Sequence, residues 1–231
     1  MFTGIIEGTA PVEALVPHGQ AHRITLNLGP LAEGVKIGDS IAVDGTCLTV
    51  TCLRGIRADF DVIRETLERT AFAALRVGQR VNVERSMRAD GRFHGHFVSG
   101  HVDGTGRVAV KRREPGQVWM TVEVSPRLTA AMIEKGSITL HGVSLTLTEV
   151  EETHFSVALI PHTLEVTSLG AMEPGSLVNV EVDMLGKWVR RLLTAYRPDE
   201  EAQADDGPKI IGPSAALGLT LEDLRRSGFG P

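Results

Sequence analysis

The feature that most constrains this chain is an internal duplication. The stretch FTGIIEGTA at residues 2–10 returns as VSGHVDGTG at 98–106, and SIAVDGTCLTVT at 40–51 returns as SITLHGVSLTLT at 137–148. Two shorter pairs follow in the same order, 66–70 with 163–167 and 78–84 with 175–181. Because self-similar segments in a fixed order fold into similar units, we predict two copies of one architecture, divided near Phe97.

Each copy consists of short β-rich runs separated by glycine-containing turns. Alternating or β-branched runs predict strands in the first copy at residues 23–28, 40–43, 48–53, 57–63 and 81–85. Helical patterns inside the copies are brief, at 65–75 and 126–134. A small sheet of short strands loses its unpaired edges when it closes, so we predict a small closed barrel in each copy.

The sequence after the second copy changes character. Apolar residues at helical spacing predict one apolar helix face over residues 185–197, formed by Leu185, Trp188, Val189, Leu192, Leu193 and Tyr196. That face could dock on its own barrel, but we favour a contact between subunits. Residues 198–208 are acidic and lack an apolar run, which predicts a flexible linker, and Thr220 to Asp223 resembles a capping box opening a short helix to Arg226.

The amino-acid composition indicates the cellular compartment and excludes some classes of binding partner. The formal net charge of -5 offers no broad cationic surface, so nucleic acid is not an expected partner. Cys47 and Cys52 fit neither a redox pair nor a zinc knuckle, which favours a reducing compartment. Without a secretory leader or an apolar run long enough to cross a membrane, the sequence predicts a cytoplasmic protein with no membrane partner.

Four motifs carry a family resemblance that covers roughly residues 1–197. MFTGII at 1–6, GRFHGHFVSGHVDGT at 91–105, GVSLTL at 142–147 and LIPHT at 159–163 are together similar to the riboflavin synthase α-chain family, built from lumazine-binding repeats. The resemblance implies an all-β fold of two tandem six-stranded Greek-key barrels and a C-terminal α-helix that assembles a homotrimer. The implied domains are a first barrel at 1–97, a second at 98–184, an oligomerisation helix at 185–197 and a tail at 198–231.

The same resemblance implies an enzyme of the transferase class. Two molecules of 6,7-dimethyl-8-ribityllumazine would react by transfer of a four-carbon unit, giving riboflavin and 5-amino-6-(ribitylamino)uracil in the last step of riboflavin biosynthesis. No cofactor and no metal would take part. The family forms its reacting pair of sites between the first barrel of one chain and the second barrel of its neighbour, and association with lumazine synthase is a further implied partnership.

The candidate catalytic residues are two histidines, a matched thiol and hydroxyl, and one aromatic ring. His96 and His101 flank the junction between the copies, and histidine titrates near neutrality. An isolated histidine more often binds a main-chain carbonyl, but the motif favours a catalytic role for this pair. Cys47 and Ser144 occupy equivalent positions before Leu-Thr. Phe2 is the fifth candidate.

The candidate substrate-binding residues follow from the matched motifs of both copies. The first set is Thr3, Gly4, Ile5, Ile6, Cys47, Leu48, Thr49, Asp61, Val62, Ile63, Arg64, Glu65 and Thr66. The second set is Gly100, His101, Val102, Lys135, Ser144, Leu145, Thr146, Ala158, Leu159, Ile160, Pro161, His162 and Thr163. Lys135 and Arg64 could hold carbonyl oxygens or an anion, and the glycines let main-chain amides approach a planar ring.

Two residues depart from the family pattern. His94 replaces a usual glycine, and His141 stands where the second copy commonly has aspartate, as Asp44 does in the first. We expect His141 to donate a hydrogen bond or carry positive charge in place of an acceptor.

Two other functions stay open. One is a non-catalytic protein of the same fold that binds lumazine or flavin as an optical antenna. The other is a metalloenzyme using His94, His96 and His101, since residues two apart on a strand, such as His94 and His96, share a face.

Overall fold

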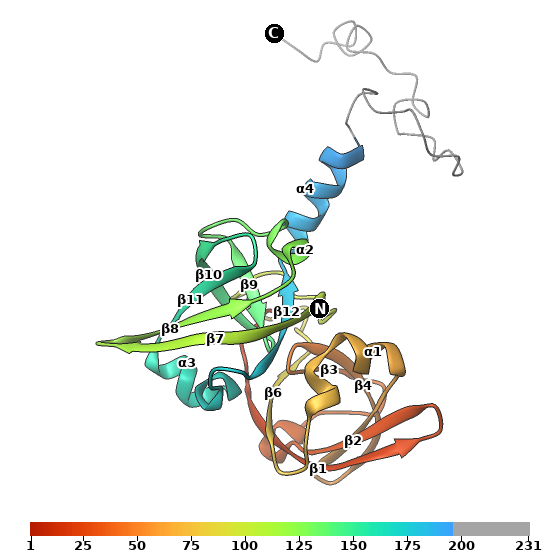
Figure 1. The fold of residues 1–231 in the computed structure, drawn as a ribbon. Coiled ribbons are helices and arrows are strands. Elements are labelled where there is room, and N and C mark those ends of the chain that lie inside the picture. Colours follow the sequence, from red (N-terminus) through yellow and green to blue (C-terminus); the bar gives the residue numbers. More distant parts are fainter. Residues whose placement is uncertain (196–231) are drawn as a thin grey trace, which may run out of the picture. The chain divides into compact units, whose positions relative to one another are not determined.

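The structure is a computed structural model and describes residues 1–195 (Figure 1). Tyr196, the linker predicted at 198–208 and the short helix predicted at 220–226 lie outside the described residues. Both barrels belong to one compact unit, Met1–Lys187.

The first copy forms a closed antiparallel barrel. Its strands are β1 (Gly8–His18), β2 (Ala21–Asn27), β3 (Ser40–Val43), β4 (Thr46–Arg54), β5 (Arg57–Val62) and β6 (Arg80–Arg85). They are paired around the barrel in the order β1-β2-β5-β4-β3-β6. Inward-facing side chains such as Ile24, Phe60 and Val83 are fully buried and form its core. The sequence missed β1 as a strand because Pro11 and Pro17 interrupt its pattern.

The second copy repeats this barrel with the same cyclic strand order. Its strands are β7 (Gly104–Glu114), β8 (Gln117–Glu123), β9 (Ser137–Leu140), β10 (Val143–Val150), β11 (His154–Leu159) and β12 (Leu177–Val182). Even the irregularities repeat, because the β1–β2 register shifts between Val12 and Ala14, and the β7–β8 register between Val108 and Val110. The predicted all-β fold of two tandem six-stranded barrels with a C-terminal helix is therefore confirmed.

Short helices connect the strands, and two of them differ from the prediction. The helix predicted at 65–75 is divided into α1 (Arg64–Arg69) and a 3-10 turn, η2 (Ala71–Ala74). Thr70 is extended between them, and its hydroxyl donates to the Thr66 carbonyl oxygen and accepts from the Phe72 amide. The helix predicted at 126–134 ends early, as α2 (Pro126–Thr129). The remaining short elements are η1 (Gly29–Ala32), α3 (Pro161–Val166) and η3 (Ser168–Ala171).

The C-terminal helix α4 spans Met184–Ala195. Five of the apolar residues predicted for one face lie on it, and each is more than half exposed: Leu185, Trp188, Val189, Leu192 and Leu193. None of the described helices has the length and apolar content needed to cross a membrane.

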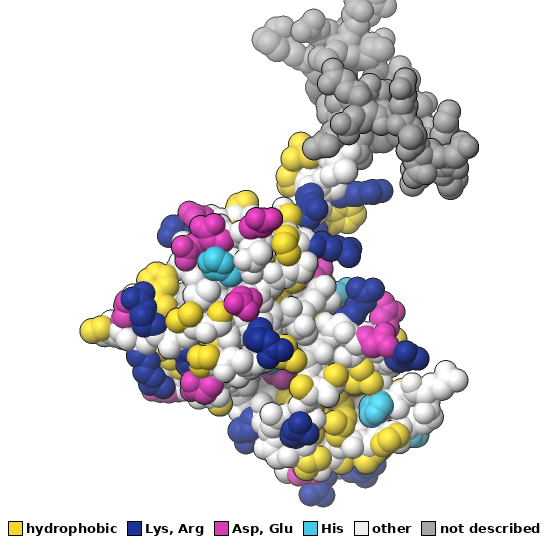
Figure 2. Space-filling model, in the orientation of Figure 1, with side chains coloured by type: hydrophobic (Ala, Val, Ile, Leu, Met, Phe, Trp, Pro, Cys, Tyr) yellow, Lys and Arg dark blue, Asp and Glu magenta, His cyan; other side chains and the backbone are white. Residues whose placement is uncertain are grey.

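The described surface carries charges of both signs. Figure 2 shows acidic and basic side chains interspersed over the visible face of the barrels, without a broad cationic area on that face.

Candidate functional site

The segments that precede the two barrels are exchanged between them. The Gly4 carbonyl oxygen, ahead of β1, accepts a 2.8 Å hydrogen bond from the Ser144 amide of the second barrel. The Gly100 carbonyl oxygen, ahead of β7, accepts a 2.8 Å bond from the Cys47 amide of the first barrel. Phe2 and Val98 pair as an antiparallel bridge between the two segments. Each segment therefore contacts the barrel of the other copy, next to the candidate residues Ser144 and Cys47.

Two buried glutamates hold the exchanged segments in place. Glu84 at the end of β6 accepts from the Thr3 amide and hydroxyl at 2.6 and 2.8 Å, and from the Gly4 amide at 2.9 Å. Glu181 on β12 makes the equivalent bonds to Ser99 and Gly100. Burial raises the pKa of each carboxyl, although the donated hydrogen bonds oppose the rise.

The exchanged segments need glycine at the point of contact. Gly4 and Gly100 have φ values of +78° and +80°, the left-handed region that L side chains avoid. A Cβ added at Gly4 would lie 2.6 Å from the Ser144 Cβ, and one at Gly100 would lie 2.6 Å from the Cys47 Cβ. The close approach of main chain to side chain therefore requires this residue type.

The first set of candidate residues lies on β4, β5 and α1 of the first barrel, with Cys47 of β4 in contact with Gly100. Cys47 is half-buried, Leu48 and Val62 are buried, and Thr49, Ile63 and His101 are exposed. The neighbouring Val102 and Thr66 are half-buried. The set thus combines an exposed apolar side chain with a thiol and an imidazole, groups that are capable of stacking and of hydrogen bonding.

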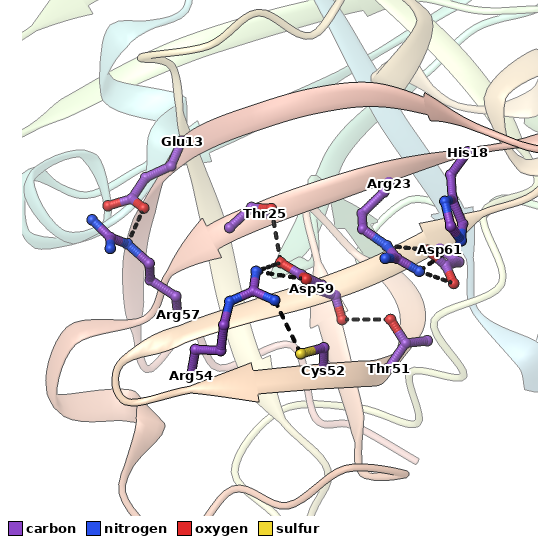
Figure 3. Close-up of polar contacts among 10 residues, drawn as sticks. All are labelled: Glu13, His18, Arg23, Thr25, Thr51, Cys52, Arg54, Arg57, Asp59 and Asp61. Carbon is purple, nitrogen blue, oxygen red and sulfur yellow. Dashed lines mark hydrogen bonds and ion pairs between the residues drawn. The ribbon is translucent and has the colours of Figure 1, made fainter.

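Charged candidates of the first site are engaged in ion pairs. Figure 3 shows Asp61 facing Arg23 across neighbouring strands, and the Asp61 carboxylate accepts from the Arg23 guanidinium at 2.8 and 3.0 Å. These hydrogen bonds lower the pKa of Asp61. On α1, Arg64 pairs with Glu68, and Glu65 pairs with Arg69. Such exposed pairs contribute little to stability, so Arg64 and Glu65 stay free to exchange partners.

The second candidate site mirrors the first around Gly4. The exchanged Ile5 is exposed, and Ile6 packs against the core of the second barrel. The candidate residues of β10, β11 and α3 range from buried to exposed, and Ser144 is the one that contacts Gly4: Ser144, Leu145, Thr146, Ala158, Leu159, Ile160, Pro161, His162 and Thr163. Lys135 is exposed, with a left-handed φ of 65° that points to a tight turn.

The two candidate histidines differ in surroundings. His96 is buried, its Nδ1 lies 2.8 Å from the Ser144 Oγ and its Nε2 lies 3.1 Å from the Thr139 Oγ1. Burial lowers its pKa, against an opposing effect of the Asp183 charge. His101 is exposed beside Gly100. Phe2 is fully buried with Ala42 and Val98. These placements bring His96 to the second site and His101 to the first.

The third histidine of the possible metal set, His94, is exposed. His94 lines an open hollow of about 540 Å³ together with Thr3 and Ile5. Among residues 1–195, no group of three or more His, Cys, Asp or Glu side chains is placed to hold a metal ion.

A buried polar network that the sequence did not predict joins the barrels. The Asp44 Oδ1 accepts from the Asn82 amide at 2.8 Å, and the His141 Nδ1 accepts from the Asn179 amide at 2.9 Å. Each asparagine then donates across the contact, Asn82 to the His141 carbonyl oxygen and Asn179 to the Asp44 carbonyl oxygen, both at 2.8 Å. The one sequence feature that could have indicated this network is the duplication, because both copies contain Val-Asn-Val-Glu.

The expected role of His141 is corrected by this geometry. We expected a donor or a positive charge, but the Nδ1 accepts as the carboxylate of Asp44 does. Burial lowers the pKa of His141 to about 3, so the ring is neutral at pH 7. The imidazole nitrogen therefore replaces the Asp44 carboxyl oxygen as acceptor without reversing the hydrogen bond.

Asp44 and His141 should give the protein two opposed pH dependences. Burial raises the pKa of Asp44 to about 7, so its stabilisation is full below pH 3.8 and is lost as pH rises through 7. For His141 the stabilisation is present above pH 6.5 and is lost as pH falls toward 3. We expect Asp44→Asn to gain stability relative to wild type on going from pH 4 to 8, and His141→Asn to gain on going from 7 to 4.

Urea unfolding at pH 4, 6 and 8 measures both variants, with each serving as the control for the other. A few kcal/mol of relative change is expected. If both variants follow the wild-type pH profile, burial does not control these two groups.

Another hollow, of about 810 Å³, lies between the barrels on the side of this network, lined by Asp44, His141, Arg80 and Arg107 among others. None of the residues predicted to bind substrate lines this hollow. This hollow is therefore separate from the candidate residues at the exchanged segments.

Known sequences and structures resemble the chain over most of its length. The lumazine binding domain family matches residues 3–86 and 99–183. A riboflavin synthase from Actinobacillus pleuropneumoniae is 40% identical over 99% of this chain and 100% of its own. One from Bacillus subtilis (strain 168) is 44% identical over 84% of this chain and 90% of its own.

Solved structures of LumP share the fold. The complex with riboflavin has a TM-score of 0.74 and 26% identity, covering 79% of this chain and 99% of that one. The complex with 6,7-dimethyl-8-(1'-D-ribityl) lumazine has a TM-score of 0.70 at the same identity and coverage. The duplication, the paired barrels and the full-length relatives agree, and the chain belongs to the riboflavin synthase family, whose lumazine binding domain it carries in two copies.

Proposed function

We propose that this chain is a riboflavin synthase, a transferase that converts two molecules of 6,7-dimethyl-8-ribityllumazine into riboflavin and 5-amino-6-(ribitylamino)uracil. The observation that carries the proposal is the 40–44% identity to riboflavin synthases over 84–99% of the chain. The duplicated site supports it independently, because a reaction between two copies of one substrate is served by two similar binding surfaces.

Positioning supplies a large part of the catalysis in this proposal. Two heterocycles held in fixed orientation react as if at very high local concentration, an effect worth roughly 7 to 11 kcal/mol of barrier. The exposed Ile63 and Ile160 occupy equivalent places in the two sites and would stack against the rings. Gly4 and Gly100 bring main-chain atoms close to each site.

Proton transfer is the remaining task, and the sites offer different groups for it. A methyl proton must leave one lumazine, and a nucleophile must add to the other. His101 with the Cys47 thiol would move protons in the first site, while the second site offers His96 and the Ser144 hydroxyl to the bound lumazine. Phe2 is fully buried and has no ionisable group, so we assign it to holding the two exchanged segments together.

The proposed function also includes an oligomeric state. We propose a homotrimer in which the first barrel of one chain faces the second barrel of a neighbour, built through the exposed apolar face of α4. Association with lumazine synthase, which would supply the substrate directly, and a cytoplasmic location are further parts of the proposal. The two free cysteine thiols, Cys47 and Cys52, suit a reducing compartment.

The decisive experiment supplies purified protein with the ribityllumazine alone. We expect riboflavin and the pyrimidine product in equal amounts, measured by absorbance and chromatography, without added metal or cofactor. Absence of riboflavin under anaerobic conditions from protein that binds the lumazine would contradict the proposal.

A binding protein without catalysis is the second candidate, because the LumP complexes hold lumazine and riboflavin on this fold. It would purify with one tightly held fluorescent ligand per chain and make no riboflavin. The His96–Ser144 contact in the second site favours the enzyme, because it places an imidazole and a hydroxyl together there.

Disrupting α4 should separate the chains and remove activity. Trp188→Asp places a charge in the exposed apolar face, whereas Thr194→Asp places the same charge on the opposite side of the helix. We expect Trp188→Asp to be monomeric by light scattering, with activity lowered more than a hundredfold, while Thr194→Asp behaves as wild type. An active Trp188→Asp monomer would show that the reacting pair lies within one chain.

A further inference from the structure

The two sites differ in the groups behind their matched thiol and hydroxyl. In the second site, Thr139 on β9 and Ser144 on β10 lie on opposite sides of the His96 ring, at 3.1 Å from Nε2 and 2.8 Å from Nδ1. The equivalent residues of the first site are Ala42 and Cys47. Ala42 has no hydroxyl, so this threonine–histidine–serine chain belongs to the second site alone.

The direction of the hydrogen bonds follows from burial. Thr139 is 1% exposed, and among residues 1–195 the only side-chain hydrogen bond of its hydroxyl is to His96. If Thr139 accepted from Nε2, its own proton would be buried without an acceptor. A buried unpaired proton is costlier than a buried unpaired lone pair. Thr139 therefore donates to Nε2.

The tautomer of His96 is set by that donation. A neutral imidazole has one N–H and one bare nitrogen, so an Nε2 that accepts leaves the proton on Nδ1. Burial keeps the ring neutral by lowering its pKa, and Asp183 is the charged group that opposes this effect. The Nδ1 then donates to the Ser144 Oγ. Ser144 is only half-buried, and its own proton is left to point to the open side of the site.

We propose that Thr139 is a positioning residue that fixes His96 with its proton on Nδ1, and so makes Ser144 a hydrogen-bond donor to the heterocycle bound in the second site. This inference rests on the proposed function for its substrate. With Nδ1 already protonated, His96 does not take the Ser144 proton, and Ser144 does not act as an activated nucleophile. Its O–H instead stabilises negative charge on the lumazine that has lost a methyl proton.

Nitrogen-15 NMR of histidine-labelled full-length protein at pH 7, without substrate, tests the tautomer directly. We expect the His96 ring, assigned by its loss in His96→Gln, to be protonated on Nδ1. Thr139→Val removes the hydroxyl at constant shape and should abolish this preference, and Thr139→Ser should restore it. Thr129→Val is the matched control, because Thr129 is another buried threonine of the second barrel and hydrogen-bonds only main-chain oxygens. Wild-type protonation on Nε2, or on both nitrogens, would overturn the proposal.

Steady-state kinetics with the ribityllumazine tests the consequence. We expect kcat of Thr139→Val to fall about tenfold with a smaller change in KM, the effect of weakening one hydrogen bond made to developing charge. Thr139→Ser keeps the hydroxyl and should therefore have a kcat close to that of the wild type. A changed tautomer with wild-type kcat would overturn the assigned role of Ser144. If no variant and no wild-type protein makes riboflavin while the tautomer is as expected, the proposed function fails and the tautomer assignment stands.

Discussion

Glu84→Gln is expected to loosen the candidate site of the other barrel more than that of its own. Glu84 lies in the first barrel, but the two amides and the hydroxyl that it accepts from belong to the segment that closes the second site. The glutamine side chain still has one oxygen that can accept. Its NH₂ group replaces the second oxygen and faces an N–H or O–H group that also donates. Losing charge-assisted bonds in a buried place should cost about 3 kcal/mol of unfolding free energy.

Amide hydrogen exchange locates the effect of this change. The Ser144 amide, which donates to Gly4, should exchange faster in Glu84→Gln, whereas the Cys47 amide should stay protected. Glu181→Gln is the matched variant, and it should expose the Cys47 amide while protecting that of Ser144. Equal effects on both amides in each variant would mean that the two segments open together.

Gly45→Ala should be among the most damaging small substitutions in the described chain. Gly45 has a φ of +77°, and an added Cβ would lie 2.6 Å from the Gly142 amide nitrogen and 2.9 Å from its Cα. Main-chain atoms cannot rotate away as a side chain does, so the barrels must separate locally. We expect a loss of at least about 3 kcal/mol in unfolding free energy.

Gly34→Ala isolates the conformational part of that loss. Gly34 has the same φ of +77°, but nothing lies within 4 Å of an added Cβ. Gly34→Ala should lower the unfolding free energy by about 1 to 2 kcal/mol, the usual penalty for an L-residue in the left-handed φ region. Urea unfolding measures the loss of unfolding free energy in each variant. The loss in Gly45→Ala minus the loss in Gly34→Ala is the part that comes from the contact with Gly142. Equal losses would show that the close approach of Gly45 and Gly142 carries no energy.

The duplication made the fold predictable, because each repeated block corresponds to a strand or turn in both copies. The strands at 40–43 and 81–85 were located nearly to the residue, since apolar alternation and flanking glycines define such elements. The break at Thr70 was not predictable in the same way. It depends on a side chain bonding its own main chain, which competes with the helix without changing the apolar pattern.

The candidate residues were predictable as a set, but their grouping was not. Motif similarity pointed to Gly4 and Ser144, yet no local pattern shows that residues 140 positions apart would share a hydrogen bond. The Asp44–Asn82 and His141–Asn179 contacts were missed for a related reason. Polar residue types usually indicate surface, and their burial follows from a barrel contact that only the three-dimensional arrangement reveals.

The exchanged segments also decide how such a protein could be redesigned. With the sites as proposed, a variant library aimed at ligand choice in the first site has to include His101 and Val102, which are encoded in the second copy. A library for the second site has to include Ile5 and Ile6 from the first copy. Grafting one barrel from a relative would therefore transplant a wall of the wrong site. Ligand specificity at each proposed site would depend on residues from both copies rather than on either half of the gene alone.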